Sequence, residues 1–120
     1  MSERAVILFA HGSRDPAWRR PIEAVAERMR VLRPASRVAC AYLELDTPDL
    51  ASAASELAQN RVNHITILPM FLGIGRHARE DLPRLVQALR QAHPELVVEL
   101  RNAIGEDERV LELLAHIASE

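Results

Sequence analysis

Three side chains of this 120-residue chain are placed for chemistry: His11, Glu44 and His77. Each follows an apolar run that predicts a buried strand, and these runs cover residues 5–10, 38–43 and 65–68. Neutral imidazole binds first-row divalent metal ions, while a carboxylate adds an oxygen ligand or accepts a proton. We therefore predict His11 and His77 as metal ligands, with Glu44 as a further ligand or a base. No H-x-x-x-H or C-x-x-C pattern supports them, so a strand-capping His11 and a solvated His77 stay open as alternatives.

Arginines flank both histidines in the sequence. Arg14 follows His11, while Arg76 and Arg79 lie on either side of His77. Guanidinium groups pair well with carboxylates and phosphates, so the three together predict a polyanionic ligand. Any one of them alone is equally well explained as a solvated loop residue. The residues that we expect to bind this ligand are Ser13, Arg14, Gly75, Arg76 and Arg79.

The loop before His77 is rich in glycine. Gly73 and Gly75 are expected to let the backbone adopt conformations that are costly for other residues. Residues 73–78 also match G-x-G-x-x-A, a pattern typical of dinucleotide binding. The match follows the third predicted strand instead of the first, and the acidic residue expected about 20 positions later is Glu99, inside a predicted strand. We interpret this match as chance and keep a small nucleotide-binding module as the weakest alternative.

The elements that must position these residues alternate along the chain. Apolar residues at helical spacing follow each strand, and a fourth strand at residues 96–101 has the alternating pattern of an edge strand. This βαβαβαβα order predicts a single α/β domain over residues 1–120, with a four-stranded parallel sheet flanked by helices on both faces. The first and third strands are the most apolar, which favours the order 2-1-3-4. Ligands bind where the winding reverses, so the loops after strands one and three should meet in one crevice.

Capping residues and prolines predict where the helices begin. We expect Thr47 to cap the second helix with Pro48 at its first position. Asp81 and Pro83 are expected near the first turn of the third helix, which leaves His77 in a loop. Asp107 should cap the last helix. The apolar residues of that helix that we expect to face inward are Val110, Leu113, Leu114 and Ile117.

Composition excludes several classes of protein. Aromatic residues make up 3% of the chain and the formal net charge is −2, which argues against a nucleic-acid partner. No apolar run approaches the roughly 20 residues of a membrane span. The single cysteine, Cys40, cannot form an intramolecular disulfide and is expected to be an inert core residue. We expect a cytoplasmic protein without a membrane partner.

Four stretches together resemble the short form of the CbiX family of tetrapyrrole chelatases. They are residues 8–14, residues 41–45 with Pro48, residues 68–83 and residues 103–107. The resemblance implies a chelatase-like half-domain, similar to one half of the longer chelatases and acting as a homodimer. One departure is Ile74, where many relatives carry a histidine.

The same resemblance implies the reaction. A divalent metal ion, Co²⁺ or Fe²⁺ with Ni²⁺ as a further candidate, would be inserted into sirohydrochlorin on the way to cobalamin or sirohaem. It implies that His11 and His77 bind the incoming metal and that Glu44 assists. The metal is then a substrate, and no permanently bound cofactor is expected. A non-catalytic carrier of metal or tetrapyrrole with the same histidines is the alternative from another class.

Overall fold

The structure is a computed structural model that describes residues 3–120. Its four strands form one parallel sheet in the order β2-β1-β3-β4. The strands are β1 (Glu3–Ala10), β2 (Arg37–Tyr42), β3 (Val62–Pro69) and β4 (Val97–Leu100). The predicted order is confirmed, and β4 is the edge strand that its alternating pattern indicated.

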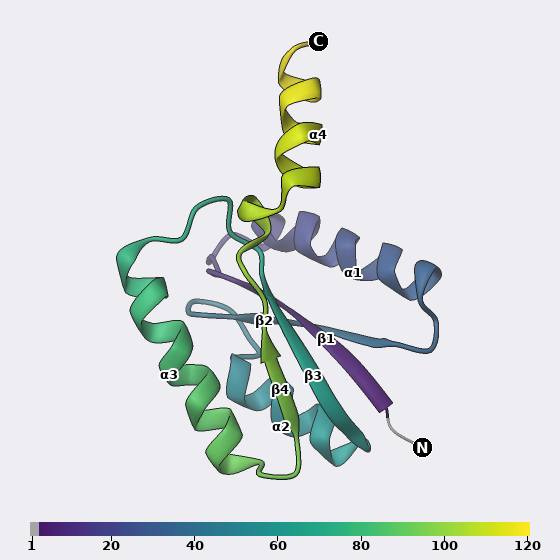
Figure 1. Cartoon of the computed structure of the whole chain (residues 1–120), viewed down its shortest axis with the longest axis vertical. Helices are drawn as coiled ribbons and strands as arrows, with labels where there is room; N and C mark the ends of the chain where they lie inside the picture. The colour runs from purple at the N-terminus through teal and green to yellow at the C-terminus, as the bar shows by residue number, and fades with distance from the viewer. Residues whose placement is uncertain (1–2) are drawn as a thin grey trace.

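Helices cover both faces of this sheet, as predicted (Figure 1). The α-helices are α1 (Arg20–Leu32), α2 (Leu50–Gln59), α3 (Arg76–Ala92) and α4 (Glu108–Ala118). Two short 3-10 helices, η1 (Pro16–Arg19) and η2 (Ile104–Glu106), precede α1 and α4. α2 and α3 lie on one face of the sheet, and α1 packs on β1 and β2 on the other.

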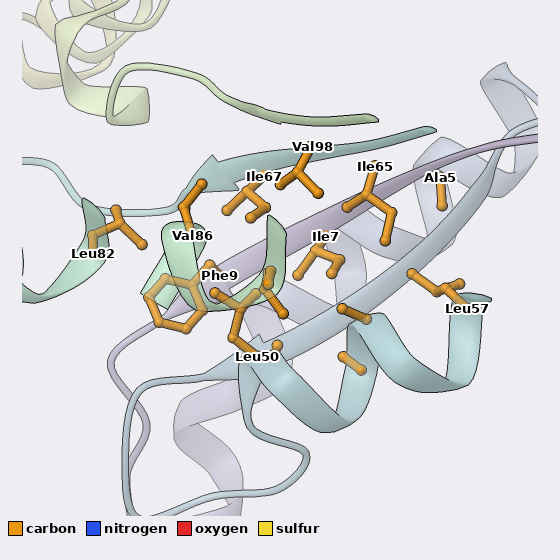
Figure 2. Close-up of a cluster of buried hydrophobic side chains, with 14 of the residues drawn as sticks. Ala5, Ile7, Phe9, Leu50, Leu57, Ile65, Ile67, Leu82, Val86 and Val98 are labelled. Carbon is orange, nitrogen blue, oxygen red and sulfur yellow. The ribbon is translucent and has the colours of Figure 1, made fainter. Parts of the chain in front are cut away.

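The main core lies between the sheet and the helices α2 and α3. Figure 2 shows Ile7 of β1 and Ile67 of β3 pointing toward these helices, with Leu50 of α2 and Val86 of α3 packed against the strands. Burying an aliphatic side chain of this size stabilises the fold by about 1.5–3 kcal/mol. This packing fixes the strand ends, and therefore the loops that leave them.

The second helix begins later than the sequence analysis predicted. Thr47 and Pro48 belong to the preceding loop, and the Pro48 carbonyl accepts a hydrogen bond from the Tyr42 backbone N–H at 2.9 Å. Asp49 is the N-cap, and its carboxylate accepts from the Ser52 N–H at 2.8 Å. Thr47 and Asp49 are both good capping residues, and the pairing of Pro48 with the end of β2 selects the later one.

The third helix begins earlier than predicted. It is capped by Gly75 and starts at Arg76, so Pro83 lies inside the helix instead of in its first turn. His77 is therefore a helix residue and not a loop residue. Ala78, Leu82, Val86 and Leu89 form the buried stripe of this helix. The burial of that stripe outweighs the missing hydrogen bond that Pro83 causes.

The last helix does not face inward. Asp107 caps it as predicted, but none of its residues is buried. α4 extends away from the sheet at the top of Figure 1, with no other element beside its outer turns. No helix within residues 3–120 has the length and apolar character that crossing a membrane requires.

Candidate functional site

The loops after β1 and β2 fit closely against each other at the carboxyl edge, where the parallel strands end. The Leu43 N–H donates to the Ala10 carbonyl at 2.9 Å, and the Glu44 N–H donates to the His11 carbonyl at 3.0 Å. Gly12 has φ +102°, and a Cβ atom there would lie 1.7 Å from the Glu44 carbonyl oxygen. Only glycine fits this position. His11 and Glu44, predicted from separate strands, therefore belong to one rigid corner.

The imidazole of His11 stacks on Phe71. The two ring centroids are 4.2 Å apart and the planes meet at 29°. Phe71 is only 3% exposed and makes an edge-to-face contact with Phe9 at 6.2 Å. His11 itself is exposed. The ring of this exposed residue thus stacks on a buried aromatic platform.

The backbone of the β3–α3 loop holds this platform in place. The Met70 N–H donates to the Phe9 carbonyl at 2.7 Å, and the Phe71 carbonyl accepts from the Gly105 N–H at 2.9 Å. A Cβ atom at Gly105 would lie 1.7 Å from the Leu72 carbonyl oxygen. The loop after β3 is therefore clamped between β1 and η2. Phe71 was not among the residues predicted from the sequence, although its place two residues after a strand in an aromatic-poor chain was a usable signal.

His77 is the second residue of α3 and is exposed. Its neighbour Ala78 is buried and anchors this first turn to the core. Arg76 pairs with Glu80 at 3.2 Å on the exposed surface of the same helix. Gly75 has φ −69°, and a Cβ atom at Gly73 or Gly75 would meet nothing within 4 Å. The expected need for glycine at these two positions is wrong, because Gly12 is the one glycine among the described residues with a positive φ.

Ser13 belongs to a hydrogen-bonded turn. Its N–H donates to Asp46 Oδ2 at 3.3 Å, and its hydroxyl oxygen accepts from the Asp15 N–H at 3.1 Å. Asp46 also pairs with Arg19 at 3.1 Å. Asp46 thus ties the loop after β2 to the loop after β1, a role that sequence analysis did not assign. Arg14 extends into solvent beside this turn.

A further arginine side chain, that of Arg101, lies near Arg79. Arg79 and Arg101 line one hollow of about 220 Å³, together with Ile74, Asn102 and Glu106. Arg101 follows β4, and its N–H donates to the Ile67 carbonyl at 3.0 Å. Ile74 packs against the core cluster. The carboxyl edge therefore carries Arg101 in addition to the three predicted arginines.

The predicted metal ligands do not form a closed cluster within one chain. Among residues 3–120, no three side chains of histidine, cysteine, aspartate or glutamate lie together so that they could hold a metal ion. His11 and His77 belong to elements that leave neighbouring strands at the same edge. Their metal binding, the role of Glu44 and the substrate contacts stay predictions.

Two titratable groups on β2 are held neutral. Burial raises the pKa of Tyr42 to about 12, and burial likewise raises the pKa of the Cys40 thiol. Cys40, which we expected to be an inert core residue, is half-buried. Neither group is a proton acceptor at neutral pH, which leaves imidazole and carboxylate as the bases near this edge.

Comparison with known proteins identifies the family. The family model described as CbiX matches residues 5–120. The chain belongs to the CbiX family. The recognition made from four sequence stretches is thus confirmed over nearly the whole chain.

Two relatives of this CbiX protein are named sirohydrochlorin cobaltochelatase. The protein of Methanopyrus kandleri is 33% identical over 82 residues, which cover 68% of this chain and 57% of that protein. The protein of Saccharolobus solfataricus is 29% identical over 121 residues, which cover 96% of this chain and 93% of that protein. The chain thus spans little more than half the length of the Methanopyrus kandleri protein. It spans almost the whole length of the Saccharolobus solfataricus protein.

Solved structures share the fold. A putative cobalamin biosynthesis CbiX protein from Marinobacter aquaeolei VT8 has a TM-score of 0.83 and 29% identity, covering 97% of this chain and 94% of that chain. The sirohydrochlorin chelatase SirB from Bacillus subtilis subspecies spizizenii, solved in complex with cobalt, has a TM-score of 0.82 and 23% identity. That match covers 98% of this chain but 50% of SirB. The expected likeness to half of a longer chelatase is therefore confirmed for the fold.

Proposed function

We propose that this CbiX protein inserts a divalent metal ion into sirohydrochlorin as a metal chelatase. The observation that carries the proposal is the exposed residue His11, whose imidazole stacks on Phe71 at the carboxyl edge. Relatives named sirohydrochlorin cobaltochelatase support the substrate. Co²⁺ is the first candidate metal, with Fe²⁺ and Ni²⁺ next. The product would enter cobalamin or sirohaem biosynthesis.

In this scheme different residues bind the metal, accept the protons and bind the substrate. Neutral His11 and His77 hold the incoming metal, which must be bound loosely enough to leave again. Metallation releases two pyrrole protons, and Glu44 or an imidazole accepts them. Arg14, Arg76, Arg79 and Arg101 pair with the carboxylates of the tetrapyrrole. The metal is a substrate, so this scheme uses no permanently bound cofactor.

We further infer that the protein acts as a homodimer. One chain has the fold of half of SirB, so two copies would supply the elements that the longer chain contains. No nucleic-acid or membrane partner enters this scheme. The cytoplasmic location expected from the sequence stays a prediction.

The test measures whether each protein chain inserts metal into many molecules of sirohydrochlorin. Sirohydrochlorin in large excess over protein is incubated with Co²⁺, Fe²⁺, Ni²⁺ or Zn²⁺, and insertion is followed by the change in its absorbance. A reaction without protein corrects for spontaneous insertion. We expect many turnovers per chain with at least Co²⁺. A reaction that stops at one equivalent would favour the carrier, and binding of NAD or ATP without metal would favour the nucleotide-binding module.

A further inference from the structure

Arg79 and Arg101 reach one hollow from two separate elements. Arg79 belongs to the first turn of α3, which the buried residues Ala78 and Leu82 anchor to the core. Arg101 directly follows β4, and its backbone N–H donates to the Ile67 carbonyl at 3.0 Å. Both side chains line the hollow of about 220 Å³ at the carboxyl edge. The fold therefore brings two guanidinium groups from distant parts of the sequence to one place.

Neither guanidinium group has a carboxylate partner in the part of the chain that the structure describes. Within residues 3–120, Arg79 and Arg101 form no ion pair and no side-chain hydrogen bond, whereas Arg76 on the same helix pairs with Glu80 at 3.2 Å. A guanidinium group carries five N–H donors in a planar fork that matches a carboxylate. Two such groups beside one hollow leave their donors available to an anion from solution.

The volume of the hollow suits a part of a tetrapyrrole and not a whole one. Sites for drug-sized molecules have volumes of about 300–1,000 Å³, and this hollow is smaller at about 220 Å³. Its apolar wall includes Pro69, Ile74 and Leu82, and Asn102 adds a side-chain amide. Methylene groups can pack on this wall while a terminal anion meets the two arginines. These features match a short acidic side arm of a larger ligand.

The charge of the hollow suits a single carboxylate. Arg79 and Arg101 supply two positive charges, and Glu106 on the same wall supplies one negative charge. The neighbouring Asp107 carboxylate is bound by Arg109 at 2.7 Å. Two positive charges and one negative charge leave one positive charge, which one carboxylate neutralises. A doubly charged phosphate would leave an unbalanced negative charge beside Glu106.

The hollow lies to one side of His11 along the carboxyl edge. In the order β2-β1-β3-β4, His11 follows β1, whereas Arg101 follows β4, two strands further across the sheet. Neighbouring strands are about 4.8 Å apart, so the ends of β1 and β4 are separated by about 10 Å. The β3–α3 loop with Phe71 lies between them. A macrocycle centred over the His11 ring carries its acidic arms outward at its rim, so one arm can extend to the hollow.

We propose that Arg79 and Arg101 together bind one carboxylate arm of the tetrapyrrole and anchor the macrocycle beside His11. This inference rests on the chelatase function proposed above. It goes beyond that function because it assigns two arginines to the same arm and separates them from Arg14 and Arg76. Arg14 extends into solvent, and Arg76 is already paired within its own helix. An ion pair inside a partly apolar hollow is stronger than one on the open surface.

The first test measures binding of metal-free sirohydrochlorin by quenching of the single tryptophan, Trp18. Arg79→Gln and Arg101→Gln should each raise the dissociation constant about 10-fold, the effect of losing a hydrogen bond between charged groups. Arg84→Gln is the matched control, because it removes the same charge from α3 outside the hollow and should bind as wild type. Circular dichroism checks that each variant is folded.

The outcomes of this test separate the two proposals. Wild-type affinity in both Arg79→Gln and Arg101→Gln would overturn the arm site and leave the chelatase proposal standing. Equal weakening by Arg84→Gln would also overturn the arm site, because a general loss of positive charge would then explain the result. A wild-type protein that binds no sirohydrochlorin would overturn both proposals.

The second test asks whether the two arginines share one arm. If they do, the double variant Arg79→Gln/Arg101→Gln should weaken binding by clearly less than the product of the two single effects. A double effect equal to that product would mean two independent carboxylates and would overturn the shared site. Glu106→Gln removes the one negative charge of the hollow and should tighten binding about twofold or more. Unchanged or weaker binding by Glu106→Gln would contradict a carboxylate in this hollow.

Discussion

At the scale of single residues, the Phe71 platform decides where the His11 imidazole can be. The stacked pair at 4.2 Å connects an exposed ring to the core through Phe9. A ligand held in one orientation loses less conformational entropy when the metal arrives than a freely rotating side chain does. We therefore assign Phe71 a positioning role and expect it to affect metal handling without touching the metal.

Phe71→Leu tests this role. Leucine keeps most of the buried volume but cannot stack, so we expect a folded protein that is destabilised by about 1.5 kcal/mol or less. The metal concentration for half-maximal insertion should rise, while the rate at saturating metal changes little. Phe9→Leu is the matched control, because it makes the same change one ring further from His11. Equal metal dependence in the two variants would show that Phe71 only fills space.

Gly12→Ala tests the rigid corner formed by the first two loops. A methyl group there would meet the Glu44 carbonyl at 1.7 Å, and φ +102° is strained for alanine. We expect a loss of about 1–3 kcal/mol in the free energy of unfolding, together with reduced insertion. Gly73→Ala, where a Cβ meets nothing within 4 Å, should behave as wild type in both assays. The measurements are urea unfolding and the insertion rate, and an unchanged Gly12→Ala would contradict the close fit.

The placement of His11 and Glu44 at one edge was predictable at this scale because strand ends carry strong signals. His11 and Glu44 follow apolar runs, and their loops do meet. Phe71, Asp46 and Arg101 were missed because their importance comes from contacts across the sheet. Gly12 was undervalued for the same reason, since the Glu44 backbone that excludes a side chain lies on another loop.

At the scale of the elements, the start of α2 depends both on which side chains can cap a helix and on the backbone hydrogen bond between the preceding loop and β2. Thr47 and Asp49 both have capping side chains, and Asp49 is chosen because Pro48 pairs with Tyr42. The hydrogen bond from the Ser52 N–H holds the pKa of Asp49 below its ordinary value. Its ionised form therefore stabilises the folded protein.

Two variants of Asp49 distinguish the contribution of its capping hydrogen bond to stability from the contribution of its negative charge. A lowered pKa in the folded state means that the stabilisation is present above the unfolded pKa, about 4, and is lost as the pH falls through the folded value. Asp49→Ala should lose about 1 kcal/mol at pH 7. Asp49→Asn should stay close to wild type at pH 7, because asparagine also caps. Unfolding followed between pH 7 and pH 2 should show the wild-type advantage over Asp49→Ala shrinking below about pH 4; a constant difference would contradict this assignment.

Element type was easier to predict than element boundaries. The apolar runs and helical stripes identified all four strands and four α-helices. The start of α3 was missed because Pro83 favours a first turn, whereas the buried stripe from Ala78 to Leu89 extends the helix through it. The direction of α4 could not be predicted, because an apolar stripe does not reveal whether its partner lies in the same chain.

At the scale of the whole molecule, the parallel sheet collects His11, Glu44 and His77 at one edge from distant parts of the sequence. The order β2-β1-β3-β4 makes β1 and β3 neighbours, so the loops carrying Phe71 and His11 touch. The order was predictable because the two most apolar strands belong in the centre. The direction in which α4 leaves the sheet was not predictable, since it depends on how the turn around Gly105 packs.

The initial rate of Co²⁺ insertion into sirohydrochlorin at limiting metal tests most directly whether His11 and His77 handle the metal. Both side chains are exposed, so His11→Ala and His77→Ala should fold with a stability change of about 1 kcal/mol or less. Each should lower the rate about 100-fold or more, because even the outer partners of metal ligands are worth 10–100-fold. His93→Ala, at the far end of α3, is the control and should insert metal at the wild-type rate. Wild-type rates in both His11→Ala and His77→Ala would contradict the site at the carboxyl edge.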